Sequence, residues 1–293
     1  MPSFIEQLPR IDLVLAASVL FALLVTLGVG RRGGRFRALP AWAGFWAALG
    51  AVLAALSLAP RWLSFPLVAV GMFTALRAYF SVAPVRPRDR YAILASYLSI
   101  PLVMWPAYIG SDEAFLATVP VLLFLFIPVF LVIGKAEKGM LDAMGRTILG
   151  VLFFVFCSAH LTLMIDLSPD TRGLPELFGV LVLASDLPQR LAGRSHHGVS
   201  WYQVTMGIVI GIVLAVGVGF WLGPWCGLVE EDGGRAGALV AIAVTLGRRV
   251  GDAVAYELAL GSASQIGRGA ILDRAVPTVY AAPVFFHYVN QFV

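Results

Sequence analysis

The chain has 293 residues, of which 59% are hydrophobic and only 13% are charged, and its mean hydropathy is +0.87. A soluble domain cannot hide that much apolar surface, so the composition excludes a soluble protein and predicts an integral membrane protein. The net charge of +4 is modest, and no feature of the sequence supports nucleic-acid binding. No P-loop, dinucleotide-binding fingerprint, zinc-protease motif or serine-hydrolase elbow is present.

About ten apolar segments have the length that a bilayer requires, roughly twenty residues each. They run near 11–30, 40–59, 62–83, 91–109, 114–134, 147–165, 174–185, 204–222, 236–250 and 275–293. The seventh ends at Asp186 and the ninth at Gly251-Asp252, and both are short. Short helices that line a cavity are one way to build a site inside a membrane. We therefore predict an all-α polytopic membrane protein with about ten transmembrane or membrane-embedded helices.

The positively charged residues are distributed unevenly between the loops. The loops after the odd-numbered segments are rich in cations, and those after the even-numbered segments are poorer in them. The cations of the odd loops are Arg31, Arg32, Arg35, Arg37, Arg86, Arg88, Arg90, Lys135, Lys138, Arg146, Arg190, Arg194, Arg248, Arg249, Arg268 and Arg274. Because positively charged loops stay in the cytoplasm, both termini are expected outside and the odd loops inside, in a bacterial inner membrane.

One stretch, Arg248 to Pro283, combines glycines, carboxylates and arginines in an otherwise strongly apolar chain. Its densest parts are Gly251-Asp252 and the run from Gly267 to Arg274. Glycines let backbone approach a ligand closely, carboxylates hold hard divalent cations, and arginines hold phosphate oxygens. Together they indicate a magnesium–nucleotide or magnesium–phospholipid site at the membrane surface. The alternative is a cytoplasmic loop whose charges are simply solvated.

The run Gly267 to Arg274, followed by Ala281-Ala282-Pro283-Val284-Phe285-Phe286-His287, resembles the C-terminal signature of the phosphatidate cytidylyltransferases, or CDP-diacylglycerol synthases. Val250-Gly251-Asp252 is similar to the Leu-Gly-Asp helix start of that family. Ala184-Ser185-Asp186, followed by Leu191-Ala192-Gly193-Arg194, resembles its Asp-x-x-Ala-Tyr-x-x-Gly-Lys stretch. The resemblance is confined to the C-terminal part of the chain, and the signature is its specific element.

The chain departs from the family pattern at several positions. Arg268 stands where the family has histidine, and Val276 stands where it has the final aspartate. The lysine-bearing Ser-Pro-x-Lys-Thr-Trp-Glu-Gly motif is reduced to Ser200-Trp201-Tyr202-Gln203, which has no lysine. The resemblance therefore supports the fold more directly than the activity.

The resemblance implies that Asp252 and Asp273 bind a divalent cation. Mg²⁺ is usually held by one or two carboxylates together with substrate phosphates, so this pair predicts Mg²⁺ as the cofactor. The alternative is structural, with Asp252 capping a helix that starts after Gly251, and Asp273 pairing with Arg268 or Arg274.

Phosphate binding is the role that the resemblance implies for Arg274 and Arg268, because a guanidinium matches phosphate geometry. Either arginine could instead extend toward lipid headgroups. Gly267 and Gly269 would let the backbone approach the substrate. Asp186 would lie in the nucleotide pocket, or would pair locally with a residue such as Arg190.

These expectations describe a single membrane domain, residues 1–293, in which helices of 147–293 form a cytoplasm-facing catalytic cavity and 1–146 supply the N-terminal helices. Asp252, Asp273 and Arg274 are the predicted catalytic residues. The resemblance implies that the substrates are CTP and phosphatidic acid and that the products are CDP-diacylglycerol and pyrophosphate. Two alternatives are a relative that binds lipid or a partner without catalysis and a membrane transporter or flippase. The sequence leaves a homodimer open.

Overall fold

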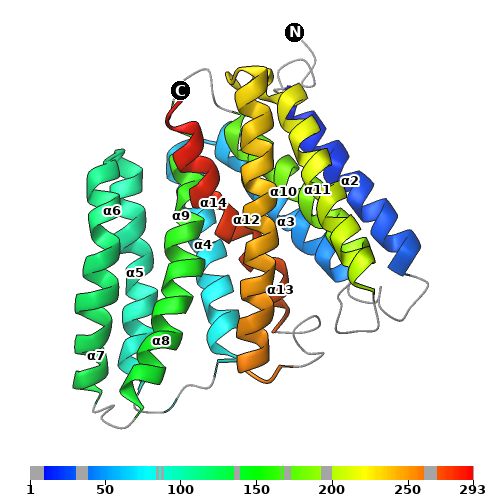
Figure 1. The fold of residues 1–293 in the computed structure, drawn as a ribbon. Coiled ribbons are helices and arrows are strands. Elements are labelled where there is room, and N and C mark those ends of the chain that lie inside the picture. The colour runs from blue at the N-terminus through cyan, green and yellow to red at the C-terminus, as the bar shows by residue number, and fades with distance from the viewer. Residues whose placement is uncertain are drawn as a thin grey trace.

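The computed structural model describes residues 10–30, 39–83, 86, 89–134, 139–165, 167, 173–192, 200–260 and 269–292. Within these ranges all regular structure is helical, which confirms the predicted all-α class (Figure 1). Five of the described helices are long and apolar enough to cross a membrane: Leu39–Leu58, Arg61–Phe80, Arg90–Ile109, Met140–Leu163 and Trp201–Cys226. The protein is therefore a helical membrane protein, whereas the number of about ten embedded helices stays a prediction.

The N-terminal half is a series of long helices, some of which contain a π-helical turn. They are α2 (Arg10–Gly30), α3 (Leu39–Leu58), α4 (Arg61–Phe80), α5 (Arg90–Ile109), α6 (Asp112–Val121), η3 (Leu122–Phe126), α7 (Ile127–Ile133), α8 (Met140–Val151), η4 (Leu152–Cys157) and α9 (Ser158–Leu163). The π-helical turn η3 precedes Pro128 at the start of α7. Proline has no N–H to donate, and the wider turn accommodates that lost helical hydrogen bond.

The C-terminal half contains α10 (Leu174–Ala192), α11 (Trp201–Leu222), η7 (Gly223–Cys226), α12 (Glu230–Glu257), α13 (Ala270–Arg274) and α14 (Val276–Val289). Two predicted boundaries are wrong. The helix predicted to end at Asp186 continues to Ala192, and the helix start predicted at Gly251-Asp252 lies inside α12. An apolar window ends at the first charge, but a helix continues through it where neighbouring helices supply partners for that charge.

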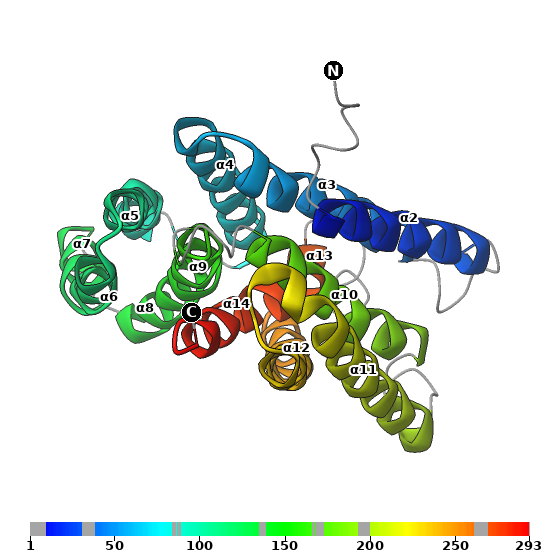
Figure 2. The ribbon, with the colours of Figure 1, turned by 90° about the horizontal axis from the view of Figure 1, so that it is seen from above.

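The helices form two groups (Figure 2). The helices α5 to α9 lie together on one side, and α2, α3 and α10 to α14 lie on the other. Helix α4 lies between the groups and contacts α3, α5 and α9. Helix α10 is central to the second group, because it packs against α2, α3, α11, α12 and α14.

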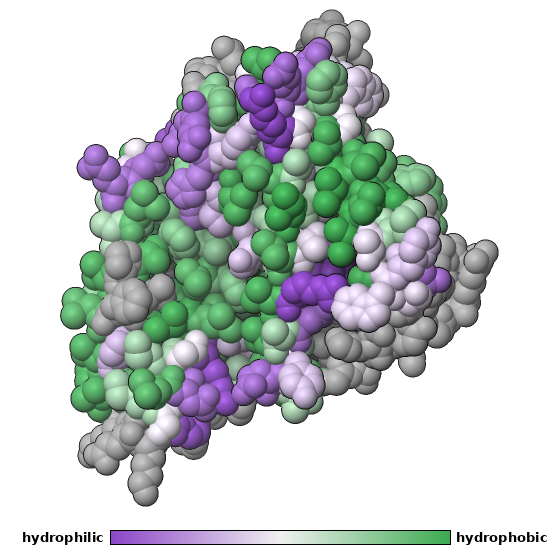
Figure 3. Space-filling view, viewed as in Figure 1, coloured by the Kyte–Doolittle hydropathy of each residue, from purple (hydrophilic) through white to green (hydrophobic). Residues whose placement is uncertain are grey.

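The helix ends that adjoin the cation-rich loops lie at one end of the bundle. The starts of α5 and α8 and the end of α12 are at the lower end in Figure 1, whereas α2 begins and α14 ends at the upper end. On the face seen in Figure 3, apolar residues cover most of the middle and polar residues gather mainly toward the two ends. This banding is the pattern expected of a protein whose middle lies in a bilayer.

Two glycines on one face of α12 bring it close to the C-terminal helices. A Cβ atom at Gly247 would lie 2.8 Å from Cβ of Tyr280 on α14, and one at Gly251 would lie 2.8 Å from the carbonyl oxygen of Leu272 on α13. Small residues one turn apart allow this close approach of helix backbones in membranes. The α12–α13 contact thereby brings together the backbone of Asp252, which follows Gly251, and that of Asp273, which follows Leu272.

Candidate functional site

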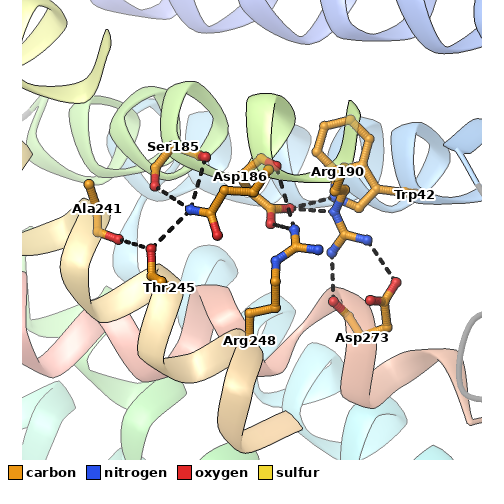
Figure 4. A network of polar contacts seen from close by, with 9 residues as sticks. Trp42, Ser185, Asp186, Arg190, Ala241, Thr245, Arg248 and Asp273 are labelled. Atoms are coloured by element: carbon orange, nitrogen blue, oxygen red, sulfur yellow. Dashed lines mark hydrogen bonds and ion pairs between the residues drawn. The ribbon is translucent and has the colours of Figure 1, made fainter. Parts of the chain in front are cut away.

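The site begins on α10, where Asp186 and Arg190 lie one helical turn apart. This i, i+4 spacing places both side chains on the same face, and Arg190 Nε donates to Asp186 Oδ2 at 2.6 Å. The face points toward α3, α12 and α13 rather than toward lipid (Figure 4). The pair therefore lies inside the bundle.

Asp186 accepts hydrogen bonds from three different helices. Besides Arg190, its carboxylate accepts from the indole Nε1 of Trp42 on α3 at 2.8 Å and from the guanidinium of Arg248 on α12. A buried carboxylate is stable only where such donors replace the lost water. Asp186 thus links α3, α10 and α12.

Arg190 connects this carboxylate to the signature segment. Its Nη1 donates to Asp273 Oδ2 at 2.7 Å, and its Nη2 donates to the backbone oxygen of Asp273 at 2.6 Å (Figure 4). Its guanidinium carbon also lies 5.2 Å from the ring centre of Trp42, within the range of a cation–π contact. One arginine therefore fixes both the side chain and the backbone of α13.

A neutral extension continues the network along α10 and α12. The side-chain nitrogen of Gln189 donates to Thr245 Oγ1 at 3.0 Å and to the backbone oxygen of Ser185 at 3.2 Å. Thr245 in turn donates to the backbone oxygen of Ala241 at 2.8 Å. These bonds hold α10 against α12 one turn from the ionic contacts.

The four charged side chains are almost entirely removed from solvent. Their exposed fractions are 3% for Asp186, 6% for Arg190, 5% for Asp273 and 11% for Arg248. The two carboxylates and two guanidinium groups balance in charge, which limits the cost of burying them. We refer to these four residues as the ionic cluster.

The predicted metal ligands lie at the α12–α13 contact. Asp252 is partly buried on α12 directly after Gly251, and Asp273 is buried on α13 directly after Leu272. Because Gly251 packs against the carbonyl oxygen of Leu272, the two carboxylates come from adjoining backbone. The capping alternative for Asp252 is wrong, because Asp252 lies inside a helix. Asp273 does pair with an arginine, Arg190, which the sequence had not indicated as its partner.

The remaining predicted residues divide between described and undescribed segments. Gly269 precedes α13, and Arg274, which is partly buried, ends it, so both lie beside Asp273. Gly267 and Arg268 lie outside the described residues. The structure thus joins Asp186 to Asp273 and brings Asp252, Gly269 and Arg274 into the same region.

Sequence reasoning named Arg190 only as a local partner of Asp186, and it missed Trp42, Gln189 and Thr245. The i, i+4 spacing of Asp186 and Arg190 was the sequence feature that predicted their contact. No signal within the sequence linked Trp42 to Asp186, which is 144 positions away. Arg248 was noted as a cytoplasmic cation, but its approach to Asp186 depends on how α12 packs on α10.

The residues at the α12–α13 contact can be compared with the donor set that a magnesium ion requires. Among the described residues no group of three or more His, Cys, Asp or Glu side chains could hold a metal ion. An all-protein cage is therefore absent from that part of the chain. Mg²⁺ needs only one or two carboxylates when phosphates and waters supply its other ligands, and Asp252 and Asp273 are the two carboxylates that adjoining backbone offers at this contact.

Comparison with known proteins gives little further information. The chain is 25% identical over 246 residues, 79% of its length, to the uncharacterized protein YnbB of Escherichia coli (strain K12), of which the match covers 80%. No family model matches the chain. No solved structure matches it either.

Proposed function

We propose that the protein transfers a cytidylyl group from CTP to phosphatidic acid, giving CDP-diacylglycerol and pyrophosphate. The observation that supports this proposal is the convergence of three separate stretches. The stretches that resemble family motifs, around Asp186, Asp252 and Asp273, meet where α10, α12 and α13 pack together. Resemblance in sequence alone did not require them to meet.

The proposed reaction joins two phosphates in the membrane surface layer. An oxygen of the lipid phosphate attacks the α-phosphorus of CTP and forms a new P–O bond. The bond from that phosphorus to the oxygen bridging toward the β-phosphate breaks, and its electron pair leaves with pyrophosphate. Catalysis of such a transfer depends on positioning and on neutralising phosphate charge.

The chain supplies positive charge and a fixed carboxylate for this reaction. Arg274 would hold phosphate oxygens, since a guanidinium donates two parallel hydrogen bonds to phosphate. Arg190 holds the side chain and backbone of Asp273 in one orientation, and Asp186 holds Arg190. Asp186 is thus a positioning residue, because three donors already surround its carboxylate.

Asp252 and Asp273 would hold Mg²⁺, which when bound neutralises triphosphate charge and orients the nucleotide. The proposal places these residues at the cytoplasmic face of a bacterial inner membrane, where CTP is available. The cation-rich helix ends at the lower end of Figure 1 support that orientation.

The test is conversion of labelled CTP by the purified full-length protein in detergent with phosphatidic acid, with and without Mg²⁺. We expect a CDP-lipid product that requires Mg²⁺. Asp273→Asn should lower the rate at least about 100-fold, since it removes a carboxylate that would hold the Mg²⁺ which neutralises the phosphates. The matched control is Asp112→Asn, which changes an exposed aspartate in the first turn of α6.

The proposal is wrong if the folded protein forms no CDP-lipid and does not bind CTP in the presence of Mg²⁺. Retained CTP binding without product would favour a relative that has lost catalysis. Transport of substrate into vesicles without CTP would favour the transporter or flippase. Equal rates for Asp273→Asn and Asp112→Asn would show that Asp273 has no role in catalysis.

A further inference from the structure

A cavity of about 360 Å³ lies between α3, α4, α9 and the α13–α14 segment. Its size is in the range of small-molecule pockets. On α3 and α4 the lining residues recur at helical spacing, with Phe45, Leu49 and Val52 on one helix and Val68 and Met72 on the other. The cavity is therefore built from one face of each helix.

The cavity shares α13 with the ionic cluster. Ile271 and Ala275 line the cavity, and Asp273, which lies between them in sequence, contacts Arg190. Residues two positions apart on a helix point in nearly opposite directions, so α13 separates an apolar compartment from a charged one. Helix α13, which belongs to the segment that resembles the family signature, thus borders both the apolar cavity and the ionic cluster.

The lining offers little to a polar ligand. The hydroxyl of Thr74 donates to the backbone oxygen of Gly71, and that of Ser158 donates to the backbone oxygen of Phe153. These two hydroxyls are therefore engaged by their own helices, and most other lining groups are hydrocarbon. A buried polar ligand would lose hydrogen bonds to water without replacement, whereas a hydrocarbon chain would not.

The cavity also opens in the direction from which a lipid would enter. Ala48 on α3 and Gly71 on α4 line it and are exposed, and both helices are candidate membrane spans. Along α3 the lining runs from Phe45 to Val52, about 10 Å at the rise of an α-helix. Trp42 of the charged region precedes it by one turn, toward the start of α3.

We propose that this cavity holds one acyl chain of the lipid phosphate substrate, with the phosphate at Arg274 and the chain running along α3 toward the middle of the bilayer. The polar-to-apolar order along α3 matches a lipid in the leaflet next to the cation-rich ends. This inference rests on the proposed function only for the identity of the headgroup. The acyl chain follows from the shape and lining of the cavity.

Gly71 provides a test with a small structural cost. Gly71 lines the cavity on its exposed side, and a Cβ atom there would meet nothing within 4 Å, so Gly71→Leu adds a side chain at the cavity lining whose first atom has free space. Gly217→Leu on α11 is the matched control, because a Cβ there also meets nothing within 4 Å and Gly217 does not line the cavity. Both changes replace a helical glycine with a better helix former.

The probe is phosphatidic acid with a photoactivatable diazirine in the middle of one acyl chain, added without CTP to the full-length protein in lipid nanodiscs. We expect cross-links on the α3 and α4 residues of the cavity. Gly71→Leu should reduce them about tenfold, whereas Gly217→Leu should leave them unchanged. Glycerol 3-phosphate, which has the headgroup chemistry but no chain, should not compete at equal concentration.

Cross-links confined to the outer surface, or equal labelling of the cavity in the two glycine variants, would overturn the inference. Because labelling requires no CTP, this result is separate from the activity test. If the cavity is labelled in a protein that makes no CDP-lipid, the proposed acyl-chain site stands and the proposed cytidylyl transfer is wrong. If Gly71→Leu has normal activity and an unchanged KM for long-chain phosphatidic acid, the acyl-chain site is wrong and the proposed transfer reaction is unaffected.

Discussion

Helix α12 contributes two arginines to ion pairs, Arg235 near its start and Arg248 farther along, and the two contacts differ in burial. At its start Arg235 pairs with Glu231 and Asp232, and the side chains of Arg235 and Glu231 are 61% and 73% exposed. Toward its other end Arg248 joins the ionic cluster, where Asp186 is 3% exposed. Both sets pair arginine with carboxylates, but Arg235 and Glu231 are open to water while Asp232 is 15% exposed, and every side chain of the ionic cluster is 11% exposed or less.

This difference indicates what each group of charges does. Exposed ion pairs contribute about 0–1 kcal/mol, and the acidic residues in the first turn of α12 also complement the helix dipole. Burying an ion pair costs about as much as its attraction returns, so the ionic cluster is a poor source of stability. Charged residues that persist inside a membrane bundle are by default candidates for function.

The largest effect on stability is expected from Arg190→Met. The substitution leaves the carboxylates of Asp186 and Asp273 buried without their shared cation. Breaking a buried pair on one side costs about 3–5 kcal/mol. The free energy of unfolding, measured by denaturant titration in detergent, should fall by that amount, and a loss below about 1 kcal/mol would show that water reaches the cluster.

A smaller effect is expected from Trp42→Phe. The phenyl ring keeps an aromatic face for Arg190 but cannot donate to Asp186. A hydrogen bond to a charged group contributes about 1.5–3 kcal/mol, so the same titration should show a loss in that range. Trp221→Phe, at an exposed indole on α11, is the matched control and should change little. Equal losses in both variants would contradict the role of the indole N–H.

The smallest effect is expected from Arg235→Gln. Its side chain is 61% exposed and that of its partner Glu231 is 73% exposed, so water replaces most of the lost contact, although Asp232 is only 15% exposed. The free energy of unfolding should change by less than about 1 kcal/mol, and the small difference should vanish at high salt. A loss of unfolding free energy comparable to that of Arg190→Met would contradict the difference in energetic role between the exposed and the buried contacts of α12.

The sequence was sufficient for the fold class and for the approximate positions of the helices. Apolar segments of bilayer length predicted helices because backbone groups in lipid must be bonded within the segment. The ends of α10 and α12 were missed for one reason. Asp186 and Asp252 are charges inside helices, and hydropathy alone cannot show that a helix continues through a charge, as α10 does where Asp186 has partners on neighbouring helices.

The candidate site was predictable in its residues but not in its connections. The resemblance named Asp186 and Asp273, and the i, i+4 spacing suggested Arg190 as a partner of the first. That Arg190 also bonds to Asp273 depends on the packing of α10 against α13. Nothing in the sequence indicated that Trp42 contacts Asp186, because an indole in an apolar helix is normally a packing or interfacial residue.

The central claim is that the ionic cluster exists for function rather than for stability. The most direct test replaces all four of its residues with apolar ones, Asp186→Leu, Arg190→Met, Arg248→Met and Asp273→Leu. Removing both signs together avoids an unpaired buried charge, so this variant should lose less stability than Arg190→Met alone. Unfolding and CDP-lipid formation are measured on the same preparation. We expect a folded protein without transfer activity. A variant that still forms CDP-lipid at the wild-type rate, or that is less stable than Arg190→Met, would contradict the claim.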